Sequence, residues 1–244
     1  MTANSQFFDA LSDDYDVMVT FENALKNKIV FLKNFEPKEH GTALDLGCGT
    51  GADAIALSKL GLRVDAMDHS KGMLVQARIN AEKHGVDINF TEASLTGLAV
   101  GTKNYDFIVS LGNTIANIPM AEVRLLISEL SKNLTDGGRI LLQLVNYAKL
   151  PKTGRYVLNE FENDSVSIIR RYNIHQNTID FSIDKVDKKS QRSSQITTTL
   201  YPHSEQDFIA IAKETGLTIN VYGNLKKDTY VAGASPNLVV VFTQ

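Results

Sequence analysis

A glycine-rich segment that follows an acidic residue is the part of the chain most indicative of chemistry. It reads Asp45-Leu-Gly-Cys-Gly-Thr-Gly51, so that Gly47, Cys48 and Gly49 precede a third glycine. Glycines in such a turn let the backbone change direction sharply and let a ligand approach the main chain closely. The spacing also satisfies the dinucleotide pattern GxGxx(G/A), so the glycines alone do not identify the ligand.

The acid before the glycines favours one kind of ligand. A dinucleotide would place a doubly anionic pyrophosphate at this turn, where the Asp45 carboxylate would repel it. S-adenosylmethionine carries a sulfonium and an ammonium but no phosphate, so a carboxylate helps to hold it. We therefore predict S-adenosylmethionine as the cofactor. The residues predicted to bind it here are Asp45, Gly47, Cys48, Gly49 and Gly51.

A second acid follows at the distance expected for a nucleoside contact. Asp68 lies at the end of the next predicted strand, where a carboxylate can accept hydrogen bonds from ribose hydroxyls. Ribose occurs in S-adenosylmethionine and in dinucleotides, so Asp68 supports nucleoside binding without distinguishing the two. His69 and Met73 are predicted to flank the adenine, although a methionine on a helix is as often a core residue.

The elements that position these residues alternate between strands and helices. Apolar residues near helical spacing predict a helix over residues 22–35. From residue 42 to residue 145, short apolar runs alternate with helical patterns, which predicts βαβ units in a parallel sheet covered on both faces. The predicted strands are 42–46, 63–68, 86–90, 106–111 and 139–145, and the predicted helices are 51–60, 70–84 and one from Pro119 to Gly137-Gly138.

The pattern changes after residue 145. Four β-rich segments separated by polar turns predict antiparallel strands inserted after the fifth parallel one. Ser204 and Asp207 then predict a capped helix that ends at Gly216. Two final strands, joined by a loop, should pair antiparallel. The β-rich segments are 157–161, 166–172, 178–185 and 194–200, and the final strands are 218–222 and 238–243.

We predict a single domain over residues 1–244. An N-terminal helical lid is predicted over residues 1–40, and the β-rich insertion, residues 153–201, is predicted to lie over the substrate pocket. The insertion could instead form a dimer surface.

Composition argues against several classes of function. The 244 residues carry a net charge of −3 and no dense Lys/Arg run, which argues against a nucleic-acid partner. Cys48 is the only cysteine and the five histidines are dispersed, so neither a disulfide nor a metal site is expected. The chain has no apolar run long enough to cross a bilayer and no signal core in residues 1–14. We expect a cytoplasmic monomer or homodimer that acts on a small molecule.

Residues 43–146 resemble the class I S-adenosylmethionine-dependent methyltransferases. The matching segments are Ala-Leu-Asp-Leu-Gly-Cys-Gly-Thr-Gly51, Val-Asp-Ala-Met-Asp68, Tyr-Asp-Phe-Ile-Val109 and Leu-Thr-Asp-Gly-Gly138. The resemblance implies a Rossmann-like α/β fold with a seven-stranded, mostly parallel sheet and a reversed last strand. It also implies that Ser94 and Leu95 meet the adenine and that Leu111 lies beside the methionine part of the cofactor. An acid is usual in the family where Ser94 stands.

Within that family, the chain resembles the glycine and sarcosine N-methyltransferases. The similar segments are 110–117, 145–147 and 200–203. This resemblance implies that Asn146 faces the substrate and that Tyr15 lies near the transferred methyl group. We predict catalytic roles for Asn146, Tyr15 and Asn113, and Tyr15 is also predicted to bind the cofactor. The other residues predicted to contact the substrate are Tyr147, Arg171, Tyr201 and His203.

The sequence also departs from those relatives. Leu144-Val145 stands where they have His-Arg, Ala148 replaces an acid, and Asn117 replaces a histidine. The arginine that holds the glycine carboxylate has no counterpart in register, so Arg170 and Arg171 are both candidates for a substrate contact. These departures leave the identity of the substrate open.

The reaction itself needs few special side chains. Methyl transfer from a sulfonium is an in-line displacement, and orientation of the reactants alone can remove ~7–11 kcal/mol of the barrier. A hydroxyl substrate would need a general base, for which His203 is the one candidate, whereas an amine need only arrive neutral. The sequence therefore favours N-methylation of an amine or amino acid. A NAD-type oxidoreductase and a non-catalytic scaffold that binds the cofactor are the alternatives.

Overall fold

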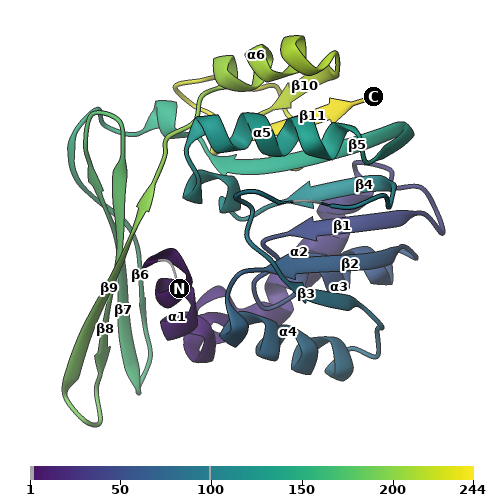
Figure 1. Ribbon diagram of the computed structural model, residues 1–244. Coiled ribbons are helices and arrows are strands. Elements are labelled where there is room, and N and C mark those ends of the chain that lie inside the picture. Colours follow the sequence, from purple (N-terminus) through teal and green to yellow (C-terminus); the bar gives the residue numbers. More distant parts are fainter. Residues whose placement is uncertain (1–2, 99) are drawn as a thin grey trace.

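The computed structural model describes residues 3–98 and 100–244, without the side chains of residues 3–5, 13 and 14. Two separate sheets form the molecule, one of seven strands and one of four (Figure 1). Residues 1 and 2 of the predicted N-terminal lid lie outside the described part of the chain. Within that part, we find no helix with the length and apolar character needed to span a bilayer.

The seven-stranded sheet has the predicted architecture. Its order is β10-β11-β5-β4-β1-β2-β3, in which β1 to β5 pair in parallel and β11 runs antiparallel to both of its neighbours. This confirms the mostly parallel sheet with a reversed last strand. The strands are β1 (Thr42–Leu46), β2 (Arg63–Asp68), β3 (Asn89–Glu92), β4 (Tyr105–Ser110), β5 (Leu134–Val145), β10 (Thr218–Tyr222) and β11 (Asn237–Thr243).

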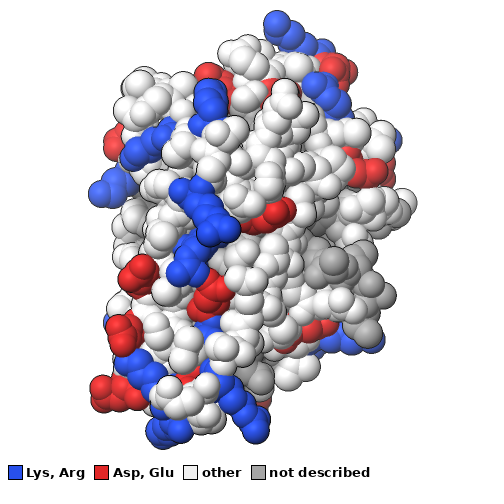
Figure 2. Space-filling model, turned by 90° about the vertical axis from the view of Figure 1, so that its left-hand side faces the viewer, with Lys and Arg blue, Asp and Glu red and all other residues white. Residues whose placement is uncertain are grey.

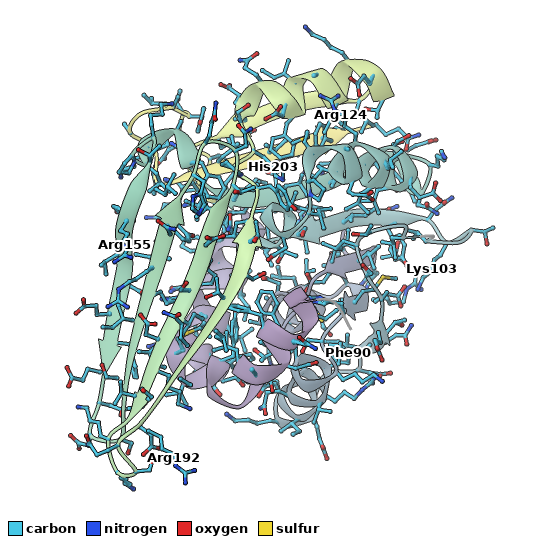
Figure 3. All side chains as sticks on the ribbon, turned by 60° about the vertical axis from the view of Figure 1, so that its left-hand side comes forward. Phe90, Lys103, Arg124, Arg155, Arg192 and His203 are labelled. Atoms are coloured by element: carbon cyan, nitrogen blue, oxygen red, sulfur yellow. The ribbon has the colours of Figure 1, made fainter. Side chains whose placement is uncertain are left out.

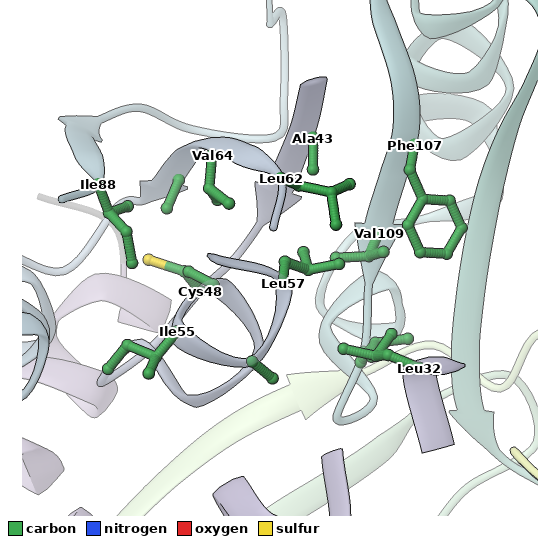
Figure 4. Packing of buried hydrophobic residues seen from close by; sticks show 14 of the residues in the cluster. Leu32, Ala43, Cys48, Ile55, Leu57, Leu62, Val64, Ile88, Phe107 and Val109 are labelled. Atoms are coloured by element: carbon green, nitrogen blue, oxygen red, sulfur yellow. The ribbon is translucent and has the colours of Figure 1, made fainter. Parts of the chain in front are cut away.

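Helices cover both faces of this sheet because its strands are apolar on both sides. On β1, Ala43 belongs to the core on one face, whereas Leu44 and Leu46 belong to the core on the other. Figure 4 shows the first core, where Leu32 and Leu57 lie near Val109 of β4. The helices on that face are α2 (Phe21–Lys33), α3 (Ala52–Lys59) and α4 (Lys71–Lys83), and those on the opposite face are α5 (Met120–Ser131) and α6 (Glu205–Thr215).

The residues after β5 form the second sheet, an antiparallel meander in the order β6-β7-β8-β9. Its inner face packs on helix α1 (Ala3–Val19), where Phe7, Leu11 and Met18 form a core with Ile168 and Ile183. This confirms the predicted antiparallel strands. Their bounds are β6 (Gly154–Glu162), β7 (Val166–Ile174), β8 (Ile179–Asp187) and β9 (Arg192–Leu200).

The outer face of the second sheet is largely polar and open. Figure 2 shows this side of the molecule, where a short streak of basic side chains lies among uncharged and acidic ones. Arg155 and Arg192 lie on this sheet, well away from the buried His203 (Figure 3). The insertion therefore presents one apolar face to the body of the protein and one hydrophilic face outward.

Several predicted boundaries were wrong; the fifth strand, for example, begins at Leu134 rather than residue 139. In two further cases a local hydrogen bond competes with the strand or helix pattern. The third strand begins at Asn89 rather than residue 86, since the Val86 N–H donates to the Ala81 carbonyl (3.1 Å) and completes the end of α4. Helix α5 ends at Ser131, well before the predicted glycine pair. The Asn133 side chain there donates to the carbonyls of Gly101 and Lys103 (2.9 Å each), and β5 starts at once.

Two predicted helix caps were correct. The Ser70 hydroxyl accepts a hydrogen bond from the Met73 N–H (3.1 Å) at the start of α4. Ser204 and Asp207 form a capping box at the start of α6, and Gly216 ends that helix in the left-handed conformation, φ 73°. These caps fix where α4 and α6 begin, so they fix the loops that precede them.

Helix α1 is fastened to the body of the protein at the start of α4. The Asp9 carboxylate accepts hydrogen bonds from the Ser70 hydroxyl (2.6 Å) and from the Gly72 N–H (3.1 Å). An acid at a helix N-terminus also interacts favourably with the helix dipole. One side chain of α1 thus satisfies donors of α4 and holds the two helices together.

Replacing Asp9 with Ala should loosen this junction. We expect the free energy of unfolding to fall by about 1–2 kcal/mol, because a charged acceptor for two donors is lost. Urea denaturation measures this loss, and amide hydrogen exchange should show faster exchange in α1. Glu82→Ala on the exposed side of α4 is the control, and an equal loss in that variant would contradict the assignment.

Candidate functional site

In the turn after β1, each of the three positions requires a glycine for a different reason. At Gly47, φ is +74° and an added Cβ would lie 2.2 Å from the Thr114 methyl group. At Gly51, a Cβ would lie 3.3 Å from the Cβ of Ala77, so this glycine permits close packing of α3 on α4. At Gly49, φ is +53° and a Cβ would meet nothing within 4 Å, which leaves open space above the backbone.

The Asp68 carboxylate connects this turn to the end of β2. One oxygen accepts the Gly49 N–H (2.9 Å), and the other accepts the Ser70 N–H (2.9 Å). Each carboxylate oxygen has a second acceptor position, so ribose hydroxyls could still bind there. The side chain borders a cavity and is therefore placed for that role.

A cavity of about 220 Å³ opens above Gly49. Five of the predicted cofactor residues besides the glycines and Asp68 line it: Tyr15, His69, Met73, Ser94 and Leu95. Phe8 of α1 covers one side, with its ring 5.8 Å from the His69 ring in an edge-to-face arrangement. The other residues that line this cavity are Ala93, Thr96, Gly112, Thr114, Asn117 and Ile118.

A second cavity of about 270 Å³ adjoins the first. The two share the walls formed by Phe8, Tyr15, Gly112 and Asn117. The second is enclosed by the inner face of the four-stranded sheet, by α1 and by the ends of β4 and β5. Its further lining residues are Leu11, Met18, Asn113, Gln143, Val145, Leu158, Arg170, Tyr172, Phe181, Ile183 and Leu200.

Asp45 lies beneath the glycine turn rather than at its mouth. Its side chain is 1% exposed and does not line the cavity, and its Oδ2 atom has no hydrogen-bond partner among the described residues. Burial raises the pKa of this carboxyl, and Asp53 and Asp68 raise it further, whereas Lys28 lowers it. The predicted acid is thus present at the turn, but it would act on a bound ligand from beneath the main chain rather than by direct contact.

Two predicted cofactor residues turn away from the cavities. The Cys48 side chain lies in the apolar core near Ile55 and Ile88 (Figure 4), and burial raises the pKa of its thiol. Leu111 is buried in the same core. Strand alternation explains Leu111, which lies on the same face as Phe107 and Val109 of β4. Cys48 instead follows Gly47, whose φ of +74° ends the extended backbone of β1.

Tyr15 and Asn113 lie where the cavities meet. Tyr15 lines both cavities, and burial together with the nearby Asp53 raises its pKa to about 12. Asn113 lines the second cavity, and its Oδ1 accepts the Val145 N–H (2.9 Å) while its amide contacts the Tyr147 hydroxyl (2.7 Å). Asn113 therefore holds the loop after β4 in place.

The Asn146 side chain, for which a catalytic role is predicted, makes its hydrogen bonds away from the two adjoining cavities. Its Nδ2 donates to the carbonyls of Ala232 (2.7 Å) and Ser235 (2.9 Å), and its Oδ1 accepts the Tyr230 hydroxyl (3.0 Å). These contacts use the whole amide to fasten the loop before β11. Asn146 does not line either of the adjoining cavities.

Three further predicted substrate residues also lie elsewhere. Tyr147 and His203 border a third cavity beyond β5, and Tyr201 lines none of the three. The His203 Nε2 contacts the carbonyls of Ile115 (3.2 Å) and Ile118 (3.0 Å), and burial lowers the pKa of this imidazole. It serves as a buried hydrogen-bonding residue, as Figure 3 shows by its position between layers.

The two candidate arginines lie on opposite faces of β7. Arg170 lines the second cavity, where its guanidinium interacts with Asn159 and lies near Tyr15 and Tyr172. Arg171 points to the outer face and pairs with Asp184. Of the two candidates, Arg170 is thus the one that borders the second cavity, whereas Arg171 borders neither of the adjoining cavities.

Sequence reasoning missed Phe8, and it named Arg170 only as an alternative to Arg171. Phe8 gave no signal, because α1 is polar and its cover over the cavity depends on contacts with distant elements. Arg170 did give one, since Ile168, Tyr172 and Ile174 alternate with it and mark the inward face of β7. From the sequence alone, that alternation predicts that Arg170 faces inward and Arg171 faces outward.

The residues present fit S-adenosylmethionine. Open space above Gly49 allows a ligand to approach the backbone, and Asp68 retains acceptor positions for ribose hydroxyls. The buried Oδ2 of Asp45, which has no hydrogen-bond partner among the described residues, lies beneath the same turn and would supply negative charge there when the carboxyl group is ionised. Among the described residues, no cluster of three or more His, Cys, Asp or Glu side chains could hold a metal ion.

Comparison with known proteins agrees with this geometry. Residues 43–138 match the family model described as a methyltransferase domain. A ribosomal protein L11 methyltransferase from Campylobacter fetus subsp. fetus is 36% identical over 106 residues, which are 43% of this chain and 35% of that protein. A glycine N-methyltransferase from Mus musculus is 26% identical over 203 residues, 72% of this chain and 69% of that protein.

Solved structures extend the match to the whole fold. An S-adenosylmethionine-dependent methyltransferase from Clostridium acetobutylicum ATCC 824 has a TM-score of 0.79 with 15% identity, over 97% of this chain and 98% of that one. The chain spans only about a third of the length of the first curated relatives it matches. Residues 43–138 therefore resemble a methyltransferase domain, and the chain as a whole shares the fold of a class I S-adenosylmethionine-dependent methyltransferase.

Proposed function

We propose that the protein transfers a methyl group from S-adenosylmethionine to the nitrogen of a small amine or amino acid. The observation that carries the proposal is the pair of adjoining cavities, one above the glycine turn and one beneath the four-stranded sheet. Their shared wall at Tyr15 and Gly112 is where the two reactants would meet. When bound, the cofactor supplies a methyl group activated by its sulfonium sulfur.

The protein contributes orientation and exclusion of water. Phe8, Leu11, Tyr15 and Met18 of α1 close the second cavity on the side opposite the sheet. Enclosure holds a substrate lone pair in line with the bond that breaks, and such alignment can remove ~7–11 kcal/mol of the barrier. The N-terminal helical lid and the β-rich insertion would then act together as the two walls of the substrate site.

The lining of the second cavity favours nitrogen as the acceptor. Among the described residues that line it, none is a carboxylate or a histidine. A hydroxyl acceptor would need a general base near neutral pH, and Tyr15, with a pKa of about 12, stays protonated there. An amine needs only to lose its own proton before it enters.

The charge in the second cavity favours a substrate with an anionic group. Within the described residues Arg170 has no carboxylate partner, and its neighbours in the cavity are aromatic or aliphatic side chains and neutral amides. A cation among such groups is stabilised by a bound anion. An amino acid with an apolar side chain fits this lining, and the similarity to a glycine N-methyltransferase supports an amino-acid acceptor.

Ligand binding separates the proposal from an oxidoreductase. We expect S-adenosylhomocysteine at one hundred times its Kd to stabilise the protein by about 2.7 kcal/mol, and NAD to have no effect. For a domain of this size, differential scanning fluorimetry should record a rise in Tm of roughly 5–10 °C. Stabilisation by NAD without a response to S-adenosylhomocysteine would exclude a methyltransferase.

The glycine turn offers a matched pair of variants. Gly49→Ala should abolish stabilisation by S-adenosylhomocysteine, because the new methyl group would enter the cavity. Gly101→Ala carries a similar strain, with φ +75° and open surroundings, but it lies outside the cavity and should bind normally. Isothermal titration calorimetry measures both affinities, and equal losses would assign the effect to backbone strain alone.

Arg170 should set the preference for a carboxylate. We expect L-phenylalanine or L-leucine to be methylated more efficiently than phenethylamine or isopentylamine, their counterparts without a carboxylate. Arg170→Met should lower kcat/KM for the amino acid by about 10²-fold, a loss of roughly 3 kcal/mol, and leave the amine unaffected. Release of S-adenosylhomocysteine gives the rate.

Arg171→Met is the control for that experiment, since this side chain faces outward and pairs with Asp184. It should retain the preference for amino acids. Turnover of the amines at rates equal to the amino acids in the unaltered protein would contradict the role of Arg170 as an anion-binding residue.

A further inference from the structure

A compact group of charges lies beneath the glycine turn, on the side away from the cavity. Asp45 of β1 and Asp53 of α3 supply two carboxylates. The Lys28 ammonium of α2 lies 2.8 Å from Oδ1 and 2.9 Å from Oδ2 of Asp53, with both side chains at most 20% exposed. The Asp45 carboxyl accepts a hydrogen bond from the Ala54 N–H of α3, next to Asp53, and both this bond and the Lys28 ammonium lower the pKa of Asp45.

The packing of α2 on α3 places Lys28 there. Phe21, Leu25 and Leu32 of α2 belong to the same core as Ile55 and Leu57 of α3, and Figure 4 shows Leu32 near Leu57. Lys28 lies between Leu25 and Leu32 in the sequence, one helical turn from each. Its ammonium is therefore held against the first turn of α3, directly below the glycines.

The charges around Asp45 do not balance without this lysine. Asp53 from α3 and Asp68 from β2 both raise the pKa of Asp45, and burial raises it most. On α1, Tyr15 and Asp16 lie in the same region, and Arg170 of β7 lies near Tyr15. Carboxylates gathered in a buried place take up protons unless a cation offsets them.

We propose that Lys28 is a positioning residue for the cofactor: its ammonium offsets the Asp53 carboxylate, so that the charge on Asp45 remains available to the ammonium of the ligand. The unpartnered Oδ2 of Asp45 is the atom left for that role. Lys28 would never touch the ligand. The inference rests on the proposed function, since it concerns the same cofactor site.

The effect should depend on the charged tail of the ligand. S-adenosylhomocysteine has an amino-acid tail, whereas adenosine has the same nucleoside without it. An electrostatic role predicts that Lys28→Met weakens the binding of S-adenosylhomocysteine and leaves the affinity for adenosine unchanged. A purely structural ion pair between α2 and α3 predicts that both ligands weaken together, because the glycine turn itself would be displaced.

The effect should also depend on pH. Without the lysine, the carboxyl group of Asp45 would keep its proton to a higher pH, and the attraction for the ligand would be lost as pH falls through that value. We therefore expect Lys28→Met to bind S-adenosylhomocysteine about tenfold more weakly at pH 6 and to recover part of this loss at pH 7.5. The unaltered protein should show a flatter profile.

The experiment is calorimetric titration of five proteins with both ligands between pH 5.5 and 7.5. Lys28→Arg keeps the charge and should bind normally, and Lys33→Met on the exposed side of α2 is the control for a lost lysine. The double variant Lys28→Met/Asp53→Asn removes the lysine and its partner carboxylate together. It restores the original charge balance and should recover affinity. Circular dichroism checks that each variant is folded.

Each result separates the alternatives. The inference is overturned if folded Lys28→Met keeps the affinity and pH profile of the unaltered protein, if adenosine weakens equally, or if the double variant fails to recover. Failure of the unaltered protein to bind S-adenosylhomocysteine would instead overturn the proposed function.

Discussion

The hydrogen bond from the Gly49 N–H to the Asp68 carboxylate is the contact on which the cofactor site depends. It joins the turn after β1 to the end of β2, so that two neighbouring parallel strands present their carboxyl ends at one edge of the sheet. The same carboxylate also accepts the Ser70 N–H and thereby sets the entry to α4. A ligand bound above Gly49 would therefore meet a surface that three elements hold in place.

The proposed substrate site depends on other contacts, because the parallel sheet alone does not enclose the second cavity. The four-stranded sheet supplies an apolar inner face, and α1 fills the space between that face and the start of α4. Asp9 fastens α1 at Ser70, the residue that follows Asp68 and His69. The same hydrogen bond between Asp9 and Ser70 thus supports both the closure of the second cavity and the position of Asp68, which is proposed to contact the ribose.

Sequence patterns predicted the parts of this structure that local rules govern. Alternation of strand and helix patterns predicted the sheet, and the capping residues Ser70 and Ser204 predicted where α4 and α6 begin. The substrate residues were predicted less well, since Asn146 is polar for a reason that only its contacts with Ala232 and Ser235 explain. A buried amide that fastens a loop and one that binds a substrate have the same sequence signature.

The placement of charge suggests how an amino-acid substrate would be oriented. The carboxyl groups of Asp45 and Asp53 lie beneath the glycine turn, whereas the positive charge of Arg170 lies in the second cavity, among neutral walls. A carboxylate attracted to Arg170 leaves the amine of the same molecule free to point toward the shared wall at Tyr15 and Gly112. The sulfonium of a bound cofactor would lie on the other side of that wall and would repel an ammonium, so the substrate nitrogen would have to face it as a neutral amine. Separation of the two charges would therefore favour the one orientation of substrate in which nitrogen faces the methyl group.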